Sequence, residues 1–242
     1  MKMTTKKYEL LTTDTITIQG HTLYRIKALR DIGDDVHTGD LGGYIETVNN
    51  LSDNGDAWVF NDAKVYGNAK VYDNAWVLGK VEIYDDAQIY GDSYVCDNAQ
   101  IHGNAKVFGN ARVYDNAWVL GKAEVYGRAS VYDRAKIFEN AQVYDGTKVY
   151  GNTQVYGKAK VYGNAQVYDN AQVCDWAWVL GQAEVYGDAQ IYGDALACNN
   201  AQIYDNAEIY DKAQIFDNAQ VYGNARVYND AWVLGKAEIY ED

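Results

Sequence analysis

From Ala57 to Asp242, apolar and polar residues follow a six-residue pattern that is never interrupted, which gives 31 consecutive hexads. The first position is small and nearly always Ala, the second is mostly Lys, Gln, Glu or Arg, and the third is Val or Ile everywhere except at Ala197. The fourth position is Tyr or Phe in most hexads, and the fifth and sixth are mostly Gly, Asp or Asn. A short fixed period of this kind predicts repeat units that stack into a solenoid.

Strand geometry gives each position of the hexad a direction. Because side chains alternate across a strand, Val or Ile at position three faces the core, and positions two and four face outward. Gly, Asp and Asn at positions five and six suit a corner, since they adopt tight or left-handed conformations at low cost. Each hexad is therefore predicted to form a four-residue strand and a two-residue corner. Three such sides close the most compact turn, which predicts an all-β, three-sided solenoid of about ten coils.

The run from Val65 to Lys70, Val-Tyr-Gly-Asn-Ala-Lys, resembles the hexapeptide repeat of left-handed parallel β-helices. In that repeat a small residue follows an aliphatic residue four places later, and the likeness extends over residues 57–242. The resemblance implies a left-handed coil, although parallel crossovers in other folds are right-handed.

The first fifty residues differ from the hexads. The alternation from Thr15 to Ile26 around Gly20 predicts a β-hairpin. We therefore divide the chain into a β cap at 1–50 and a hexapeptide-repeat β-helix at 51–242. The segments 28–32, 39–46 and 50–52 resemble the lead-in of phage, prophage and bacterial proteins of the YdcK type, which are often labelled transferases without demonstrated activity. The cap is expected to cover the open edge of the first coil, because an exposed β-edge invites aggregation.

Composition and charge narrow the possible partners. The formal net charge is −13, and such an acidic rod should repel nucleic acid and anionic membranes. We expect no membrane span and no secretory leader, since no long apolar run is present. Cys96, Cys174 and Cys198 show no metal-ligand spacing, so we expect no disulfide framework, no metal, no cofactor and a cytoplasmic location.

Aromatic residues eighteen positions apart should stack on one face of the rod. One such column comprises Tyr114, Tyr132, Tyr150, Tyr168, Tyr186, Tyr204, Tyr222 and Tyr240. Two interpretations stay open. Tyrosine suits an exposed strand, and stacked rings stabilise adjacent coils. Alternatively, the column is an aromatic strip that binds a protein partner, a sugar polymer or another copy of the chain.

Acidic residues also stack, at one corner of the predicted coil. Asp97, Asp115 and Asp133 occupy successive fifth positions eighteen residues apart. Turn chemistry explains them without a function. Since like charges at strand spacing repel, the alternative is a bound cation or a basic partner. In its sharpest form this alternative is a DNA mimic or an inhibitor of a host protein.

An acyltransferase is the enzyme that resemblance to this fold implies, with a His base and a loop that breaks the coils. The chain has only His21, His37 and His102, none of which matches a family motif, and no loop interrupts the hexads. We therefore assign no catalytic residue. The sequence favours a non-catalytic structural or protein-binding solenoid of phage or prophage type, with an acyltransferase-like enzyme as an alternative.

Two further expectations concern the tryptophans and the last coils. Trp76, Trp118 and Trp178 should fall on three different faces, and only Trp232 should share the face of Trp178, which favours duplication of gene segments over a designed site. The last coil is expected to pair with a second copy, most simply as an end-to-end dimer, and otherwise through aromatic faces side by side.

Overall fold

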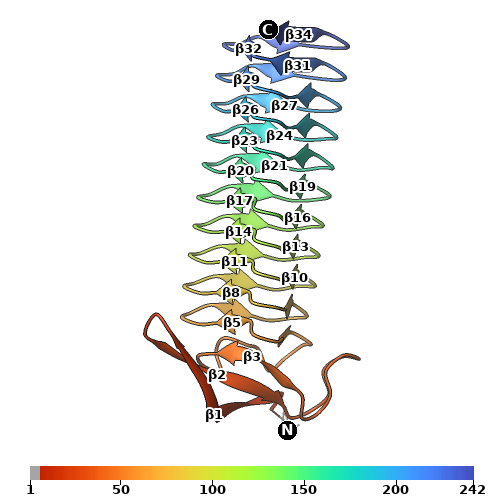
Figure 1. The fold of residues 1–242 in the computed structure, drawn as a ribbon. Coiled ribbons are helices and arrows are strands. Elements are labelled where there is room, and N and C mark those ends of the chain that lie inside the picture. The colour runs from red at the N-terminus through yellow and green to blue at the C-terminus, as the bar shows by residue number, and fades with distance from the viewer. Residues whose placement is uncertain (1–5) are drawn as a thin grey trace.

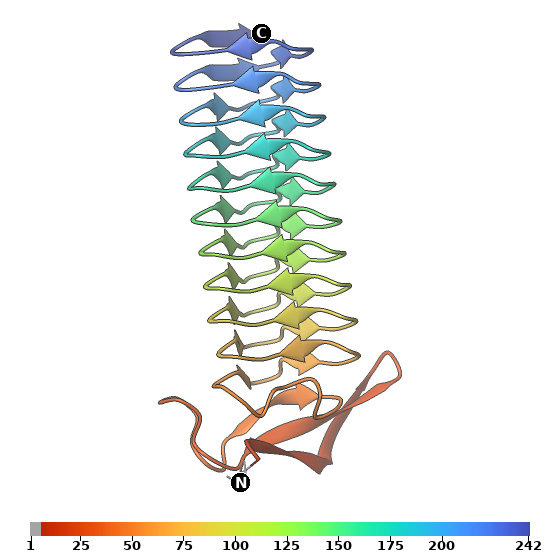
Figure 2. The same ribbon diagram turned by 180° about the vertical axis from the view of Figure 1, so that it is seen from behind.

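A computed structural model describes residues 6–242 and shows a straight stack of thin, three-sided turns with a β cap at one end (Figure 1). The view from behind shows the same outline, with the C-terminus at the end opposite the cap (Figure 2). Three sheets of 13, 11 and 10 strands run along the stack, which has about eleven turns. The all-β, three-sided parallel solenoid predicted from the hexads is confirmed.

The cap consists of β1 (Tyr8–Ile18), β2 (His21–Ala28) and β3 (Leu41–Ile45). Strands β1 and β2 form an antiparallel hairpin that turns at Gln19 and Gly20, as the alternation around Gly20 predicts. Strand β3 pairs antiparallel with β2 and parallel with β5 (Lys64–Val65), so it joins the hairpin to the first coil.

Three sheets carry the coils, and we number them by size. Sheet I continues from β3 and β5 through β8 (Glu82–Ile83), β11 (Gln100–Ile101), β14 (Trp118–Val119), β17 (Lys136–Ile137), β20 (Gln154–Val155), β23 (Gln172–Val173), β26 (Gln190–Ile191), β29 (Glu208–Ile209) and β32 (Arg226–Val227). Sheet II contains β4 (Trp58–Val59), β7 (Trp76–Val77), β10 (Tyr94–Val95), β13 (Arg112–Val113), β16 (Ser130–Val131), β19 (Lys148–Val149), β22 (Gln166–Val167), β25 (Glu184–Val185), β28 (Gln202–Ile203), β31 (Gln220–Gly223) and β34 (Glu238–Glu241). Sheet III contains β6 (Lys70–Val71), β9 (Gln88–Ile89), β12 (Lys106–Val107), β15 (Glu124–Val125), β18 (Gln142–Val143), β21 (Lys160–Val161), β24 (Trp178–Val179), β27 (Leu196–Ala197), β30 (Gln214–Ile215) and β33 (Trp232–Val233).

Most coil strands are two residues long, so the predicted length of four residues was wrong. Only positions two and three pair as strand, because the chain already turns at position four. There the carbonyl of Phe60 accepts the N–H of Ala63 at 3.1 Å, and Asn61 between them has φ 54°. Hydrogen bonding between coils nevertheless continues around the corner, where the N–H of Asp62 donates to the Gly79 carbonyl at 3.0 Å.

The core is a narrow column of small and β-branched side chains. Position-three residues such as Val167 and position-one residues such as Ala165 have no exposed surface through most of the stack. Thr147 and Thr153 also lie inside, and their hydroxyls donate to carbonyls of the preceding hexad at 2.8 and 2.7 Å. This satisfies the buried hydroxyls locally. Within residues 6–242, no helix is long and apolar enough to cross a membrane.

Candidate functional surface

The tyrosine column lies on the outer face of sheet II. From Tyr114 to Tyr222, successive rings stack with centroids 4.8–5.0 Å apart and planes within 4° of parallel. Tyr240 extends the column at 5.5 Å. The structure therefore brings together all of the tyrosines that the eighteen-residue spacing predicts on one face: Tyr114, Tyr132, Tyr150, Tyr168, Tyr186, Tyr204, Tyr222 and Tyr240.

In-register pairing produces this stacking. Residues eighteen apart pair directly, as Gln166 and Glu184 do, so equivalent side chains repeat at the strand spacing of about 4.8 Å. From Tyr114 to Tyr222 each ring is half-buried by its neighbours, whereas Tyr240 is exposed. Burial first, and then the adjacent phenols Tyr114 and Tyr150, raise the pKa of Tyr132 to about 12. The phenols therefore stay neutral at physiological pH, and the column is an uncharged aromatic strip with hydroxyl groups.

Amide and carboxylate side chains border the aromatic strip. Position two of the same strands is Gln or Glu from Gln166 onward, and Gln166 Nε2 donates to Glu184 Oε1 at 3.4 Å. At Tyr204 the phenol hydroxyl itself donates to Gln220 Oε1 at 3.3 Å. The face thus combines flat apolar rings with side-chain hydrogen-bonding groups, which is the chemistry of many protein-binding surfaces.

The acidic corner has a structural role. Asp97 Oδ2 accepts the N–H of Asp115 at 3.3 Å, Asp115 Oδ2 accepts that of Asp133 at 3.3 Å, and Asp133 Oδ2 accepts that of Gly151 at 3.0 Å. All three Asp residues have φ between 57° and 64°, a region that Asp tolerates better than most residues. Each carboxylate thus holds the next coil through a backbone N–H that the sheet ladder does not use, and its other oxygen remains for solvent or a partner.

The three histidines lie apart from one another. His37 is exposed in a loop, with Nδ1 3.8 Å from Asp40 Oδ2. His102 stacks on Tyr84 with ring centroids 4.6 Å apart, and burial lowers its pKa although Asp85 opposes this effect. His21 lies on β2, where its Nδ1 is 2.9 Å from Glu46 Oε1.

An open groove of about 1120 Å³ lies between the cap and the first coils, lined among others by His21, Glu46, Lys70, Tyr72 and Gln88. The His21–Glu46 pair in its wall is a contact that the sequence analysis did not foresee. Such a pair can hold and orient a proton at the imidazole. Glu46, however, also binds the first coil.

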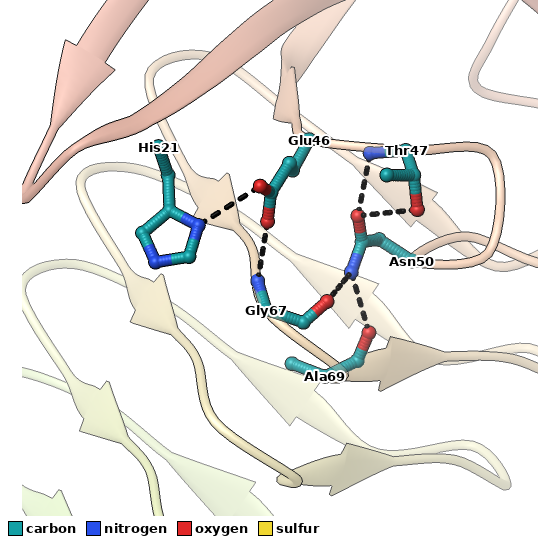
Figure 3. A network of polar contacts seen from close by, with 6 residues as sticks. All are labelled: His21, Glu46, Thr47, Asn50, Gly67 and Ala69. Atoms are coloured by element: carbon teal, nitrogen blue, oxygen red, sulfur yellow. Dashed lines mark hydrogen bonds and ion pairs between the residues drawn. The ribbon is translucent and has the colours of Figure 1, made fainter.

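Figure 3 shows how Glu46 and Asn50 complete the first coil. Glu46 Oε2 accepts the N–H of Gly67 at 2.8 Å, just as Asp85 Oδ2 accepts that of Gly103 at 3.0 Å two coils later. The buried Asn50 side chain donates to the carbonyls of Gly67 and Ala69 at 3.0 and 2.8 Å.

The oxygen of the same amide fixes the loop that carries Asn50. Asn50 Oδ1 accepts the N–H of Thr47 at 2.7 Å, and the Thr47 hydroxyl lies 3.3 Å from it. Asn50 is thereby oriented so that both of its N–H groups point at the first coil (Figure 3).

Lys7 also supplies a side-chain donor to the first coil, at the cap end of sheet II. Its side chain has no exposed surface, and its Nζ donates to the Ala57 carbonyl at 2.8 Å and lies 3.5 Å from that of Gly55. Burial, followed by the charge of Arg30, lowers the pKa of Lys7 to about 8. Together with β3, these cap residues occupy hydrogen-bonding positions that a preceding coil would otherwise fill.

The tryptophans occupy the predicted faces. Trp76 lies on β7 of sheet II, Trp118 on β14 of sheet I, and both Trp178 and Trp232 on sheet III. Trp176 was not among the residues singled out from the sequence. It occupies a sixth position and is 56% exposed, with Lys158 Nζ 3.9 Å from its ring centroid. An aromatic residue at this corner position was the signal that could have found it.

Comparison with known proteins agrees with the repeat pattern. Residues 105–121 and 219–235 match the family model of the YdcK Beta solenoid repeat. No curated protein matches the chain. Within residues 6–242, no group of three His, Cys, Asp or Glu side chains is placed to hold a metal ion. The chain is therefore a β-solenoid protein, and two of its segments are similar to the YdcK solenoid repeat.

Proposed function

We propose that this protein is a non-catalytic structural or binding solenoid that recognises a protein partner through the tyrosine column of sheet II and the acidic corner beside it. The stacked column from Tyr114 to Tyr222 is the observation that carries the proposal. Neutral rings provide contact area with little conformational entropy to lose, and Tyr is enriched at protein interfaces. The net charge of −13 favours a basic or neutral partner surface and opposes nucleic acid and anionic membranes.

The origin of the protein and its location in the cell belong to the same proposal. The lead-in at 39–46 resembles phage and prophage proteins, which supports a phage or prophage origin. Cys96, Cys174 and Cys198 are free thiols, which suits the reducing bacterial cytoplasm.

A pull-down from bacterial lysate, read by mass spectrometry, tests the tyrosine column. The test variant carries Tyr150→Ser, Tyr168→Ser and Tyr186→Ser on sheet II. The matched control carries Tyr126→Ser, Tyr144→Ser and Tyr162→Ser, which removes three stacked or neighbouring rings from sheet III. A partner held by the wild type and the control but lost by the test variant supports the proposal. Equal capture by both variants contradicts it.

An acyltransferase-like enzyme is the second candidate, and the groove beside His21 and Glu46 is the observation that favours it. Calorimetry with acetyl-CoA tests it. Saturable binding that His21→Ala or His102→Ala abolishes would establish this alternative in place of the non-catalytic proposal.

A DNA mimic or inhibitor of a host protein is the third candidate, supported by the carboxylates of Asp97, Asp115 and Asp133 in one column. A captured partner that is a DNA-binding protein, and that DNA displaces from the rod, would support it. Asp115→Asn should then weaken capture. Asp188→Asn, at the sixth position of a hexad and outside the Asp97–Asp115–Asp133 column, serves as the control.

Self-association is part of the proposal as well, and an end-to-end contact through the coils nearest Asp242 is one candidate for it. Ile239 occupies a third position, which is buried elsewhere, yet it is 38% exposed, and Tyr240 is 63% exposed. A second copy joined end to end would cover both side chains. If this contact alone forms the dimer, light scattering should report a dimer for the wild type and a monomer for Ile239→Asp.

A further inference from the structure

The outer face of sheet III differs from the other two faces in its C-terminal half. Over β24, β27, β30 and β33, positions two and four carry apolar side chains with only Gln214 and the thiol of Cys198 among them. We call this surface the apolar face and define it by Trp178, Leu180, Leu196, Phe216, Trp232 and Leu234. The corresponding positions of sheets I and II carry mainly Tyr, Gln and Glu.

Side chains of the apolar face are accessible. Trp232 is 64% exposed and Leu234 is 50% exposed, Trp178 is also exposed, and the others are half-buried. Phe216 contacts Trp232 edge to face with ring centroids 5.9 Å apart, so the apolar surface continues from one coil to the next. Contiguous apolar surface of this kind marks an interaction site on a soluble protein.

We propose that the apolar face is where two copies of this chain pair side by side and antiparallel. Such a contact lies on sheet III, and it goes beyond partner binding by the tyrosine column of sheet II. The charge of the chain favours contact through this face. Two chains that each carry −13 repel one another over most of their surface, whereas the six side chains of the apolar face carry no charge.

The repeat also makes the apolar face complementary to a second copy of itself. A two-fold axis perpendicular to the rods, midway between β27 and β30, sets coils of one chain opposite coils of the other in reverse order. Trp178 then faces the partner's Trp232, and Leu180 faces the partner's Leu234. Cys198 faces the partner's Phe216, so the smallest side chain of the face meets a large one. An isologous contact of this kind is closed and produces a dimer, not a fibre.

Charged residues at the edge of the apolar face are complementary in the same antiparallel arrangement. Asp194 and Lys212 are exposed sixth-position residues at the corner between sheets I and III, and neither forms an ion pair with another residue of the range 6–242. The same two-fold axis places Asp194 opposite the partner's Lys212 and Lys212 opposite the partner's Asp194. The four side chains alternate in charge around the axis. Parallel pairing would instead set this corner against the uncharged Asn200 and Asn218 of the opposite corner.

Charge reversal tests both the face and the direction of pairing. Sedimentation velocity at micromolar concentration should show a dimer for the wild type. Asp194→Lys puts four like charges together and should give a monomer, with a dissociation constant raised at least tenfold. The double variant Asp194→Lys with Lys212→Asp restores the alternation and should recover the dimer. Asp188→Lys makes the same change of net charge at a corner away from sheet III and should leave the dimer intact.

A second variant tests the apolar contact. Trp232 is exposed in the single chain. The variant Trp232→Ser should therefore keep the circular dichroism of the wild type and still give a monomer. A monomeric wild type would overturn the proposal. A dimer that survives both Asp194→Lys and Trp232→Ser would also overturn it, and an end-to-end pair would be such a dimer. Partner capture by the tyrosine column is a separate readout, so the two proposals fail independently.

Discussion

Asn50 and Ala69 are nineteen residues apart, and the side-chain amide of the first donates to the carbonyl of the second at 2.8 Å. The same nitrogen reaches the carbonyl of Gly67 at 3.0 Å. Inside the stack these two carbonyl positions are served by backbone, for example by the N–H of Asp86 at Gly103 and that of Lys70 at Ala87. The Asn50 side chain therefore supplies two hydrogen bonds that backbone N–H groups of a preceding coil would otherwise donate. The first edge of the stack is thereby closed to further strand pairing.

Replacing Asn50 should destabilise the cap end of the rod. Asn50→Leu keeps the volume but leaves the two carbonyls without donors, which should cost about 1–3 kcal/mol. Asn50→Asp keeps the acceptor for Thr47 and also loses the donors, so it should be no more stable than Asn50→Leu. Equilibrium urea unfolding measures both. Asn68→Ala, an exposed position-six change on the same coil, serves as control and should stay within about 0.5 kcal/mol of the wild type.

Lys7 should make stability rise with pH in the alkaline range. Its pKa is about 8 in the folded chain against 10.5 in the unfolded chain, because burial disfavours the ammonium ion. Between these values the unfolded chain holds a proton that the folded chain has lost, so raising the pH favours folding. The wild type should therefore gain stability relative to Lys7→Met from pH 8 toward 10.5.

The measurement for Lys7 is the difference in free energy of unfolding between the wild type and Lys7→Met across that range. A difference that is independent of pH, or that falls as pH rises, would show that the ammonium ion is solvated in the folded protein.

Ionisation of the tyrosine column should lower the stability of the folded chain at higher pH. The pKa of Tyr132 is raised from 10.0 to about 12 by burial and by its neighbours in the stack. Its contribution to stability is fully present below pH 10 and is lost as pH rises toward 12, because the unfolded chain ionises first. Tyr132→Phe keeps the stacked ring and should reduce this alkaline loss. Phenolate absorbance followed together with circular dichroism records ionisation and unfolding in one titration.

The hexad alone was enough to predict the directions of the side chains. A strict period fixes which residues share a face, so the Tyr114–Tyr222 column, the buried Val167 and the three faces of the tryptophans follow from counting. Strand length did not follow. The turn bond from position one back to position four depends on backbone geometry at a left-handed residue, and residue types do not reveal where the ladder stops.

The cap and the apolar face show why the rest was harder. Lys7 Nζ donates to the carbonyl of Ala57, fifty residues away in the sequence, and no periodic pattern connects the two residues. A lone lysine near the start of a chain indicates a solvated surface residue by default. On sheet III the signal was present, since Trp178, Leu196 and Trp232 interrupt the usual polar second position. These three residues form a continuous apolar surface only together with Leu180, Phe216 and Leu234, which occupy fourth positions of the same sheet.

The paired variants Val167→Asp and Tyr168→Ser test most directly the claim on which the proposed function rests, that tyrosines lie outside a core of aliphatic residues. Val167 is fully buried, and a carboxylate there should cost several kcal/mol, of order 3–5. Tyr168→Ser removes one half-exposed ring from the stack and should cost on the order of 1 kcal/mol. Urea unfolding of the two proteins should therefore show a large loss for the first and a small loss for the second. Equal losses, or a larger loss for Tyr168→Ser, would contradict the outward assignment of the column.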